Sequence, residues 1–166
     1  MIREDFDPLA GFSEIERLVS KIYLRFSHLF FDRPALREFW WEMGLEEEQH
    51  ASILLACKAL IDNYEDEELD PSVTQEKASE LKEKLSTFLR QGTPSLTVEE
   101  AFQIAVEIET SEIDVIYSKL LQLGGPKIAQ TMQNLGVPAS VQRQKLKAAL
   151  RRYSSDAKLL AEAERL

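Results

Sequence analysis

Hydrophobic residues recur every three or four positions along most of this 166-residue chain, which is the spacing of one face of an α-helix. The first such stripe follows Asp7-Pro8, where an N-cap residue precedes a proline at the first helical position. This pattern predicts a helix over residues 8–31. Its inward face carries Phe12, Val19, Tyr23, Phe26 and Phe30, with Glu16 on the same stripe.

A second stripe starts after the short break at residues 31–34 and predicts a helix that extends to about Asn63. Its inward positions are Leu36, Trp40, Met43, Glu47, His50, Leu54, Cys57 and Ile61. A short connection makes two helices antiparallel neighbours. Glu16 and Glu47 are equally distant from this turn, so we expect them at the same height in the hairpin.

Residues 64–96 form a long connection with its own predicted helix. An acidic loop over residues 65–71 leads into a charged amphipathic stretch over 74–90, and Gly92, Thr93 and Pro94 follow it. A connection of this length can return the chain to the opposite end of a bundle. The pattern therefore predicts antiparallel hairpins joined by a long crossover.

Two further stripes complete the pattern. Thr97 to Glu100 reads as a capping box that opens a helix ending before Gly124, and residues 126–135 form a short helical excursion. The third stripe is Val98, Phe102, Ala105, Glu109, Glu112, Ile116, Leu120 and Leu123. The fourth helix is expected to start near Pro138 and carries Leu146, Ala149, Tyr153, Asp156, Leu160 and Ala163. We expect Tyr153 at the level of Glu109.

Composition and length agree with an all-α fold and exclude several function classes. The chain has 6 Gly and 6 Pro, too few for the turns of an all-β protein, and its length suits a single domain over residues 1–166. The net charge of −9 disfavours nucleic acid as a partner. The basic residues between 143 and 152 are interpreted as a solvated helix face.

The chain shows no sign of export or of membrane insertion. Its first seven residues contain no apolar segment of the signal-peptide kind, and no stretch approaches the roughly 18 apolar residues of a membrane span. A cytoplasmic protein with no membrane contact is expected. The single Cys57 allows neither an internal disulfide nor a CxxC pair, so any electrons must come from another protein.

Acidic residues interrupt the hydrophobic stripes and carry the candidate chemistry. Because Glu47 and His50 are three residues apart, they share one helix face. An ionised carboxylate without a partner costs several kcal/mol to bury, and the stripes offer no Lys or Arg beside these acids. Bound cations are the expected neutralisation, and carboxylates with an imidazole suit iron or manganese. The predicted ligands are Glu16, Glu47, His50, Glu109, Glu112 and Asp156, with Tyr153 as a ligand or hydrogen-bond donor beside them.

Each predicted ligand also has a simpler interpretation, which the sequence leaves open. Glu47 and His50 can lie on a solvated face, and Glu16 can close a helix-capping box. The two acids of the third stripe can border the bundle and face water. Asp156 can be solvent-facing, and Tyr153 can be an ordinary core tyrosine.

The pattern resembles the rubrerythrin branch of the ferritin-like family. The matching motifs are Glu16 with Tyr23, Glu47-Glu48-Gln49-His50-Ala51, and Glu109-Thr110-Ser111-Glu112 with Tyr117. The resemblance covers about residues 8–63 and 97–166 and leaves the linker helix unmatched. It implies a ferritin-like four-helix bundle with a non-haem di-iron site that reduces peroxide or oxidises ferrous iron. Glu16 would be a terminal ligand, Glu47 a bridge, and His50 a nitrogen ligand.

The fourth helix departs from this family pattern. The family has a second Glu-x-x-His there, whereas this chain has Tyr153-Ser154-Ser155-Asp156. The resemblance then implies one tight site and one weak or empty site, holding one or two iron ions, with manganese or zinc possible. Related proteins often pair their bundles, which implies a homodimer.

Two functions from different classes follow from these expectations. The first is an iron protein that reacts with peroxide or dioxygen and receives electrons from an external donor protein. The second is a helical bundle that has lost redox turnover and serves as a scaffold, sensor or interaction module. Iron storage is a third, which would require a closed cage of subunits.

Overall fold

The structure is a computed structural model that describes residues 6–61, 72–91 and 95–166. Within these ranges the chain is helical and forms no strand, so the predicted all-α class is confirmed. The helices in chain order are α1 (Pro8–Leu29), α2 (Pro34–Leu60), α3 (Gln75–Gln91), α4 (Val98–Glu109), α5 (Ile113–Leu121), the 3-10 turn η1 (Gln122–Gly124), α6 (Pro126–Gln133), α7 (Ala139–Tyr153) and α8 (Ala157–Ala163).

Several expectations fall on residues that the structure does not describe. The acidic loop over 65–71 and the stop over 92–94 lie outside the described residues, as do the first five residues. The second helix is expected from the sequence to reach Asn63, but it ends at Leu60, because the backbone of Ile61 is already extended. In the ranges that are described, no helix is long and apolar enough to cross a membrane.

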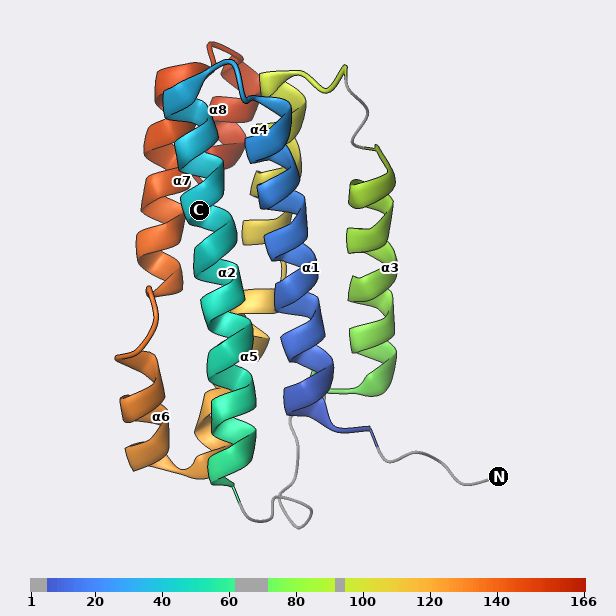
Figure 1. Ribbon diagram of the computed structural model, residues 1–166, viewed down its shortest axis with the longest axis vertical. Coiled ribbons are helices and arrows are strands. Elements are labelled where there is room, and N and C mark those ends of the chain that lie inside the picture. Colours follow the sequence, from blue (N-terminus) through green and yellow to red (C-terminus); the bar gives the residue numbers. More distant parts are fainter. Residues whose placement is uncertain (1–5, 62–71, 92–94) are drawn as a thin grey trace.

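The α1–α2 hairpin forms as the sequence predicts. Two serines of α1 bond to backbone carbonyls of α2: Ser13 Oγ donates to Ala51 at 3.0 Å and Ser20 Oγ to Gly44 at 2.8 Å. Both bonds join residues equally distant from the interhelical turn. Glu16 therefore lies at the height of Glu47, as expected, and the two helices run antiparallel side by side (Figure 1).

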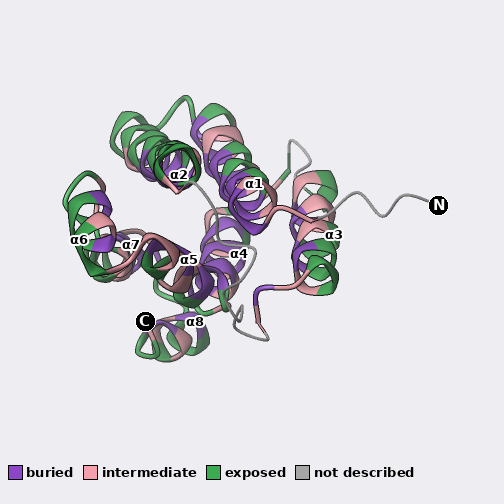
Figure 2. Ribbon diagram, turned by 90° about the horizontal axis from the view of Figure 1, so that it is seen from below, coloured by how far each residue is buried: buried purple, intermediate pink, exposed green. Residues whose placement is uncertain are grey.

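The remaining helices build a second layer and a flank. Behind the α1–α2 pair lie α4, α5 and α7, and the buried faces of these helices converge on the interior (Figures 1 and 2). The predicted linker helix is confirmed as α3, which lies along α1 and buries Ala78, Leu81, Leu85 and Phe88. The predicted excursion after Gly125 is confirmed as α6.

The third predicted helix is not continuous, which corrects the sequence expectation. It breaks between α4 and α5, where Thr110 Oγ1 donates to the Val106 carbonyl at 2.6 Å and Ser111 Oγ to the Ile108 carbonyl at 2.5 Å. Such side-chain bonds offer the backbone an alternative to the helical ladder. The break leaves Glu109 buried at the end of α4 and turns Glu112 to the surface.

The fourth predicted helix is also broken. Its first part is α7, and Asp156 then starts α8 as an N-cap whose Oδ1 accepts from the Leu159 backbone N–H at 2.9 Å. The short α8 folds back on α7. Glu164, the residue that follows α8, forms ion pairs with Lys147 and Arg151 of α7. One inward stripe therefore does not run through both helices.

Candidate metal centre

Three predicted ligands converge in the hairpin interior. Glu16 comes from α1, and Glu47 and His50 come from α2. One donor atom from each lies within 4.8 Å of the other two, and the residues are only 2%, 3% and 2% exposed. Donors bound to one ion at about 2.0–2.2 Å lie up to about 4.4 Å apart, so small side-chain rotations bring these three onto a single ion. The simpler interpretation of a solvated face is excluded for this group.

The hydrogen bond of His50 to the backbone orients its other ring nitrogen toward the carboxylate of Glu47. Its Nε2 lies 2.8 Å from the backbone carbonyl of Val137. A carbonyl only accepts, so Nε2 carries the hydrogen, and the lone pair of a neutral ring is on Nδ1. Nδ1 faces Glu47 Oε2 at 3.3 Å. Two acceptors in this position need a proton or a metal ion between them, and metal-binding histidines commonly donate their other N–H to a carbonyl.

The loop between α6 and α7 closes over this histidine. Gly136 lies so near that an added Cβ would sit 2.7 Å from Ile53 Cδ1 and 3.5 Å from His50 Cδ2. The ring of Tyr117 lies beside the imidazole, with the ring centroids 4.6 Å apart. The imidazole is therefore held by the Val137 carbonyl and by close packing.

Gln142 of α7 supplies a contact that sequence reasoning missed. Its Nε2 donates to Glu47 Oε1 at 2.9 Å, and the residue is fully buried. Among the described residues, the buried acceptors without a hydrogen-bond partner are Gln142 Oε1, Glu16 Oε2 and, outside the cluster, Glu46 Oε2. Unpaired buried acceptors are costly, and a cation bound by the group would satisfy Glu16 Oε2. This donor chemistry fits one metal ion.

Burial and mutual repulsion control the charge of the acids. Burial raises the pKa of Glu16 well above its usual value, and the negative charge of Glu47 raises it further. Burial would lower the pKa of His50, yet the hydrogen bond and charge of Glu47 and the Val137 carbonyl raise it overall. Without a cation, the cluster therefore favours bound protons.

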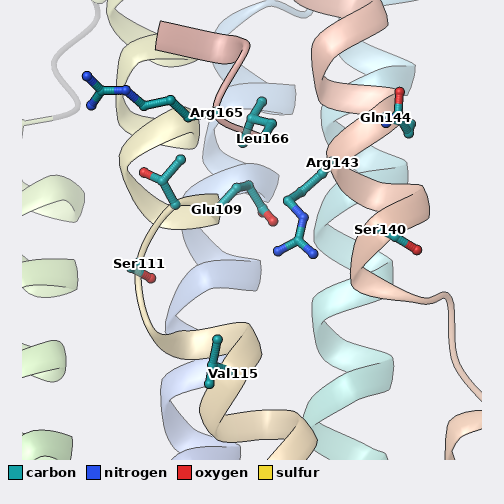
Figure 3. A pocket seen from close by; sticks show the side chains of 9 residues that line it. Glu109, Ser111, Val115, Ser140, Arg143, Gln144, Arg165 and Leu166 are labelled. Carbon is teal, nitrogen blue, oxygen red and sulfur yellow. The ribbon is translucent and has the colours of Figure 1, made fainter.

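Glu109 borders this cluster and also faces a pocket. The Tyr23 hydroxyl donates to Glu109 Oε1 at 2.6 Å. Burial and the charges of Glu47 and Asp114 raise the pKa of Glu109, more than the Tyr23 bond and Arg143 lower it. A pocket of about 680 Å³ is lined by Glu109, Thr110, Ser111, Val115, Ser140, Arg143, Gln144, Arg165 and Leu166 (Figure 3). The pocket reaches the acid layer at the α4–α5 break.

The other predicted ligands lie outside the cluster. The side chain of Glu112 is 59% exposed and pairs with Lys77 of α3, so its expected inward position is wrong. Asp156 is exposed and caps α8 instead of facing the interior.

Tyr153 is half-buried and lies under the guanidinium groups of Arg33 and Arg152, 5.8 and 5.3 Å from its ring centroid. It is eleven residues beyond Gln142, the α7 residue that contacts Glu47, which places it about 16 Å higher along the helix. The predicted level of Tyr153 is therefore wrong.

Asp114 and Arg143 are further members of the layer that sequence reasoning missed. Arg143 Nη1 donates to Asp114 Oδ2 at 3.1 Å, and Asp114 is only 15% exposed. Burial and Glu47 raise the pKa of Asp114 to about 6, despite the opposing charge of Arg143. The sequence signal for Asp114 is the Thr110-Ser111 pair, which breaks the helix and turns Asp114 inward. The signal for Gln142 is its position one turn before Leu146 on the inward stripe. The interpretation of the basic residues as a solvated face is wrong for Arg143 and for Lys147, whose side chains are 32% and 14% exposed.

Fold and site together define an all-helical protein whose buried carboxylate–histidine group has the donor set of a metal centre. Comparisons with protein-family models, with curated proteins and with solved structures give no match.

Proposed function

We propose that this protein binds a transition-metal ion, with iron the leading candidate, through Glu16, Glu47 and His50. The observation that carries the proposal is that His50 Nδ1 faces the buried carboxyl group of Glu47, while Glu16, which has an oxygen without a partner, offers a donor atom to the same group. Two carboxylates and an imidazole suit iron and manganese, and zinc also accepts this set.

Redox chemistry with peroxide or dioxygen extends this proposal. A ferritin-like, rubrerythrin-like origin is supported by the Glu on the first helix and the Glu-x-x-His on the second, both placed inward. Bound iron would supply the electron-transfer chemistry. The chain's own residues orient the ligands: the Val137 carbonyl aligns His50, and Gln142 aligns Glu47. The pocket at Glu109 offers a small oxidant a path toward the layer.

Partners and location belong to the same proposal. Cys57 is the only cysteine and is buried, so an external protein would deliver electrons. A homodimer in the cytoplasm is the expected form. Trp41 and Leu45, which are 52% and 48% exposed and one turn apart on α2, are an apolar surface that such a dimer can cover.

Metal analysis tests the binding proposal. After anaerobic loading with ferrous iron and removal of free ions, we expect close to one ion per chain, and a large loss in His50→Ala. The chain's other histidine provides a matched control: His28 is exposed on α1, so His28→Ala should bind as the unchanged protein does. Negligible metal in the unchanged protein, or equal metal in both variants, would overturn the proposal.

The second candidate function is a metal-binding or metal-free bundle without redox turnover. It is favoured by a specific observation: Gln142 and Arg143 already contact Glu47 and Asp114, which partly stabilises the acid layer without an ion. Mixing ferrous-loaded protein with one equivalent of peroxide separates the two functions. Oxidation much faster than that of free ferrous iron supports the redox protein, and an equal rate supports the scaffold.

A further inference from the structure

The positive charge of Arg143 enters the acid layer from α7. Four carboxyl groups make up this layer: Glu16, Glu47, Glu109 and Asp114. The guanidinium bonds to Asp114 at 3.1 Å and extends toward the carboxylate of Glu109 (Figure 3). Its charge opposes the rise in pKa of both groups. The two lysines nearest to Arg143 in the sequence of α7 form ion pairs with other acids: Lys145 pairs with Glu46 and Lys147 with Glu164.

Gln142 and Arg143, which are adjacent on α7, bond to different carboxylates of the layer. Gln142 bonds to Glu47 on the side of the α2 ligands, whereas Arg143 bonds to Asp114 on the side of α5. Glu109 also has one oxygen engaged, because it accepts from the Tyr23 hydroxyl. The carboxylates that a second ion would use are thus already bound to protein donors.

Provided that the centre proposed above binds metal, we propose that Arg143 takes the place of a second metal ion and makes the centre mononuclear. One divalent ion and the guanidinium together bring a charge of +3 to four carboxylates. A guanidinium does not lose its proton in proteins, so this part of the neutralisation is permanent. Glu109 and Asp114 are then partners of Arg143 and not metal ligands.

The number of bound ions tests this assignment. We would titrate the full chain with manganese(II) and count bound ions from the loss of the free-ion EPR signal. The unchanged protein should bind one ion, and Arg143→Gln should bind a second, because Glu109 and Asp114 lose their cation. Arg143→Lys, which keeps the charge, should stay at one, as should Arg152→Gln, which removes an exposed arginine of the same helix.

A second variant keeps the test decisive if Arg143→Gln does not fold. Glu109→Gln retains an acceptor for Tyr23 and should leave the number of ions unchanged and the dissociation constant within tenfold of that of the unchanged protein. Two ions in the unchanged protein, a folded Arg143→Gln that still binds one, or a tenfold weaker binding in Glu109→Gln would each overturn the inference. No binding in the unchanged protein would instead defeat the metal proposal itself.

Discussion

Glu16 is a carboxyl group that the fold buries beside another carboxyl group. Its Oε2 has no hydrogen-bond partner among the described residues, and its pKa is raised first by burial and then by Glu47. Without metal, this side chain therefore holds a proton more tightly than an exposed glutamate does. In the proposed metal complex the ion must displace that proton, so Glu16 would link metal binding to the stability of the protein.

Replacing Glu16 separates its two roles. Glu16→Gln keeps the shape and removes the ionisable group, so we expect metal binding to weaken by at least about tenfold. Without metal, the free energy of unfolding at neutral pH should stay the same or rise by about 1–3 kcal/mol, because a poorly satisfied acid is lost. Calorimetric titration and urea unfolding with a chelator measure the two effects.

The exposed neighbour Glu14, which pairs with Lys82 of α3, offers the matched control. Glu14→Gln should change the free energy of unfolding by less than about 0.5 kcal/mol and leave metal binding intact. Undiminished metal binding in Glu16→Gln would show that Glu16 is not a ligand.

At the scale of the elements, close contact between α1 and α2 brings the proposed ligands together. Gly44 of α2 lies against Leu24 of α1, where an added Cβ would sit 2.8 Å from both Cγ and Cδ2 and 3.3 Å from the backbone nitrogen. The Gly44 carbonyl also accepts from Ser20. A side chain at this position would separate the helices that hold Glu16 and Glu47.

Gly44→Ala should therefore destabilise the protein despite the better helix propensity of alanine. Propensity favours alanine by about 1 kcal/mol, whereas forced separation of packed elements typically costs about 1–3 kcal/mol. We expect a net loss of about 1 kcal/mol in urea unfolding, together with weaker metal binding. Ser52→Ala, on the exposed face of the same helix, should be near neutral. A stabilised Gly44→Ala would contradict the close approach.

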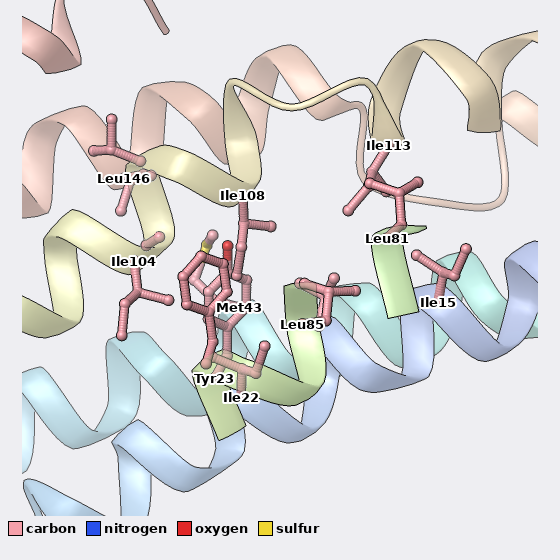
Figure 4. Close-up of a cluster of buried hydrophobic side chains, with 14 of the residues drawn as sticks. Ile15, Ile22, Tyr23, Met43, Leu81, Leu85, Ile104, Ile108, Ile113 and Leu146 are labelled. Carbon is pink, nitrogen blue, oxygen red and sulfur yellow. The ribbon is translucent and has the colours of Figure 1, made fainter. Parts of the chain in front are cut away.

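The flanking helix α3 contributes to the site indirectly. Its Leu81 and Leu85 lie in the same buried cluster as Ile15 and Ile22 of α1 (Figure 4). Its Lys77 pairs with Glu112 at the break between α4 and α5. The linker helix thus covers α1, which carries Glu16, and gives Glu112 a partner on the surface.

For the whole molecule, the buried layer predicts an unusual dependence of stability on pH. The folded-state pKa values of Glu16 and Glu109 lie above 4.5, that of Asp114 rises from 3.8 to about 6, and that of His50 rises above 6.5. All four groups therefore bind protons more strongly in the folded state than in the unfolded state. Stability from these groups is lost as the pH rises through their folded-state pKa values.

Metal should reverse this trend, because the ion replaces the protons. In the presence of a chelator, we expect the unfolding temperature to fall from about pH 5 to about pH 8. At a fixed concentration of manganese(II), the stabilisation should grow over the same range, because the dissociation constant falls as the protons leave. It reaches about 2.7 kcal/mol where the free ion is in hundredfold excess over the dissociation constant. For a chain of this size that is a shift of about 5–10 °C. A metal-induced shift that does not depend on pH would contradict proton displacement.

The sequence by itself determined the elements whose signals are local. Asp7-Pro8 started α1, unbroken stripes defined α1 and α2, and an amphipathic stretch defined α3. It also determined the group of Glu16, Glu47 and His50, because continuous helices joined by a short turn leave little freedom in register. The ferritin-like relationship stays a proposal, since no comparison tests it.

Only the tertiary structure decided how the second half of the chain completes the layer. A helix keeps its phase only while it is unbroken. The interruption at Thr110-Ser111 therefore turned Glu112 to the surface and Asp114 toward the interior, and the start of a new helix at Asp156 kept that residue out of the layer. The height of α7 depends on packing across the molecule rather than on spacing along the chain. That packing placed Gln142 and Arg143, and not Tyr153, beside the acids.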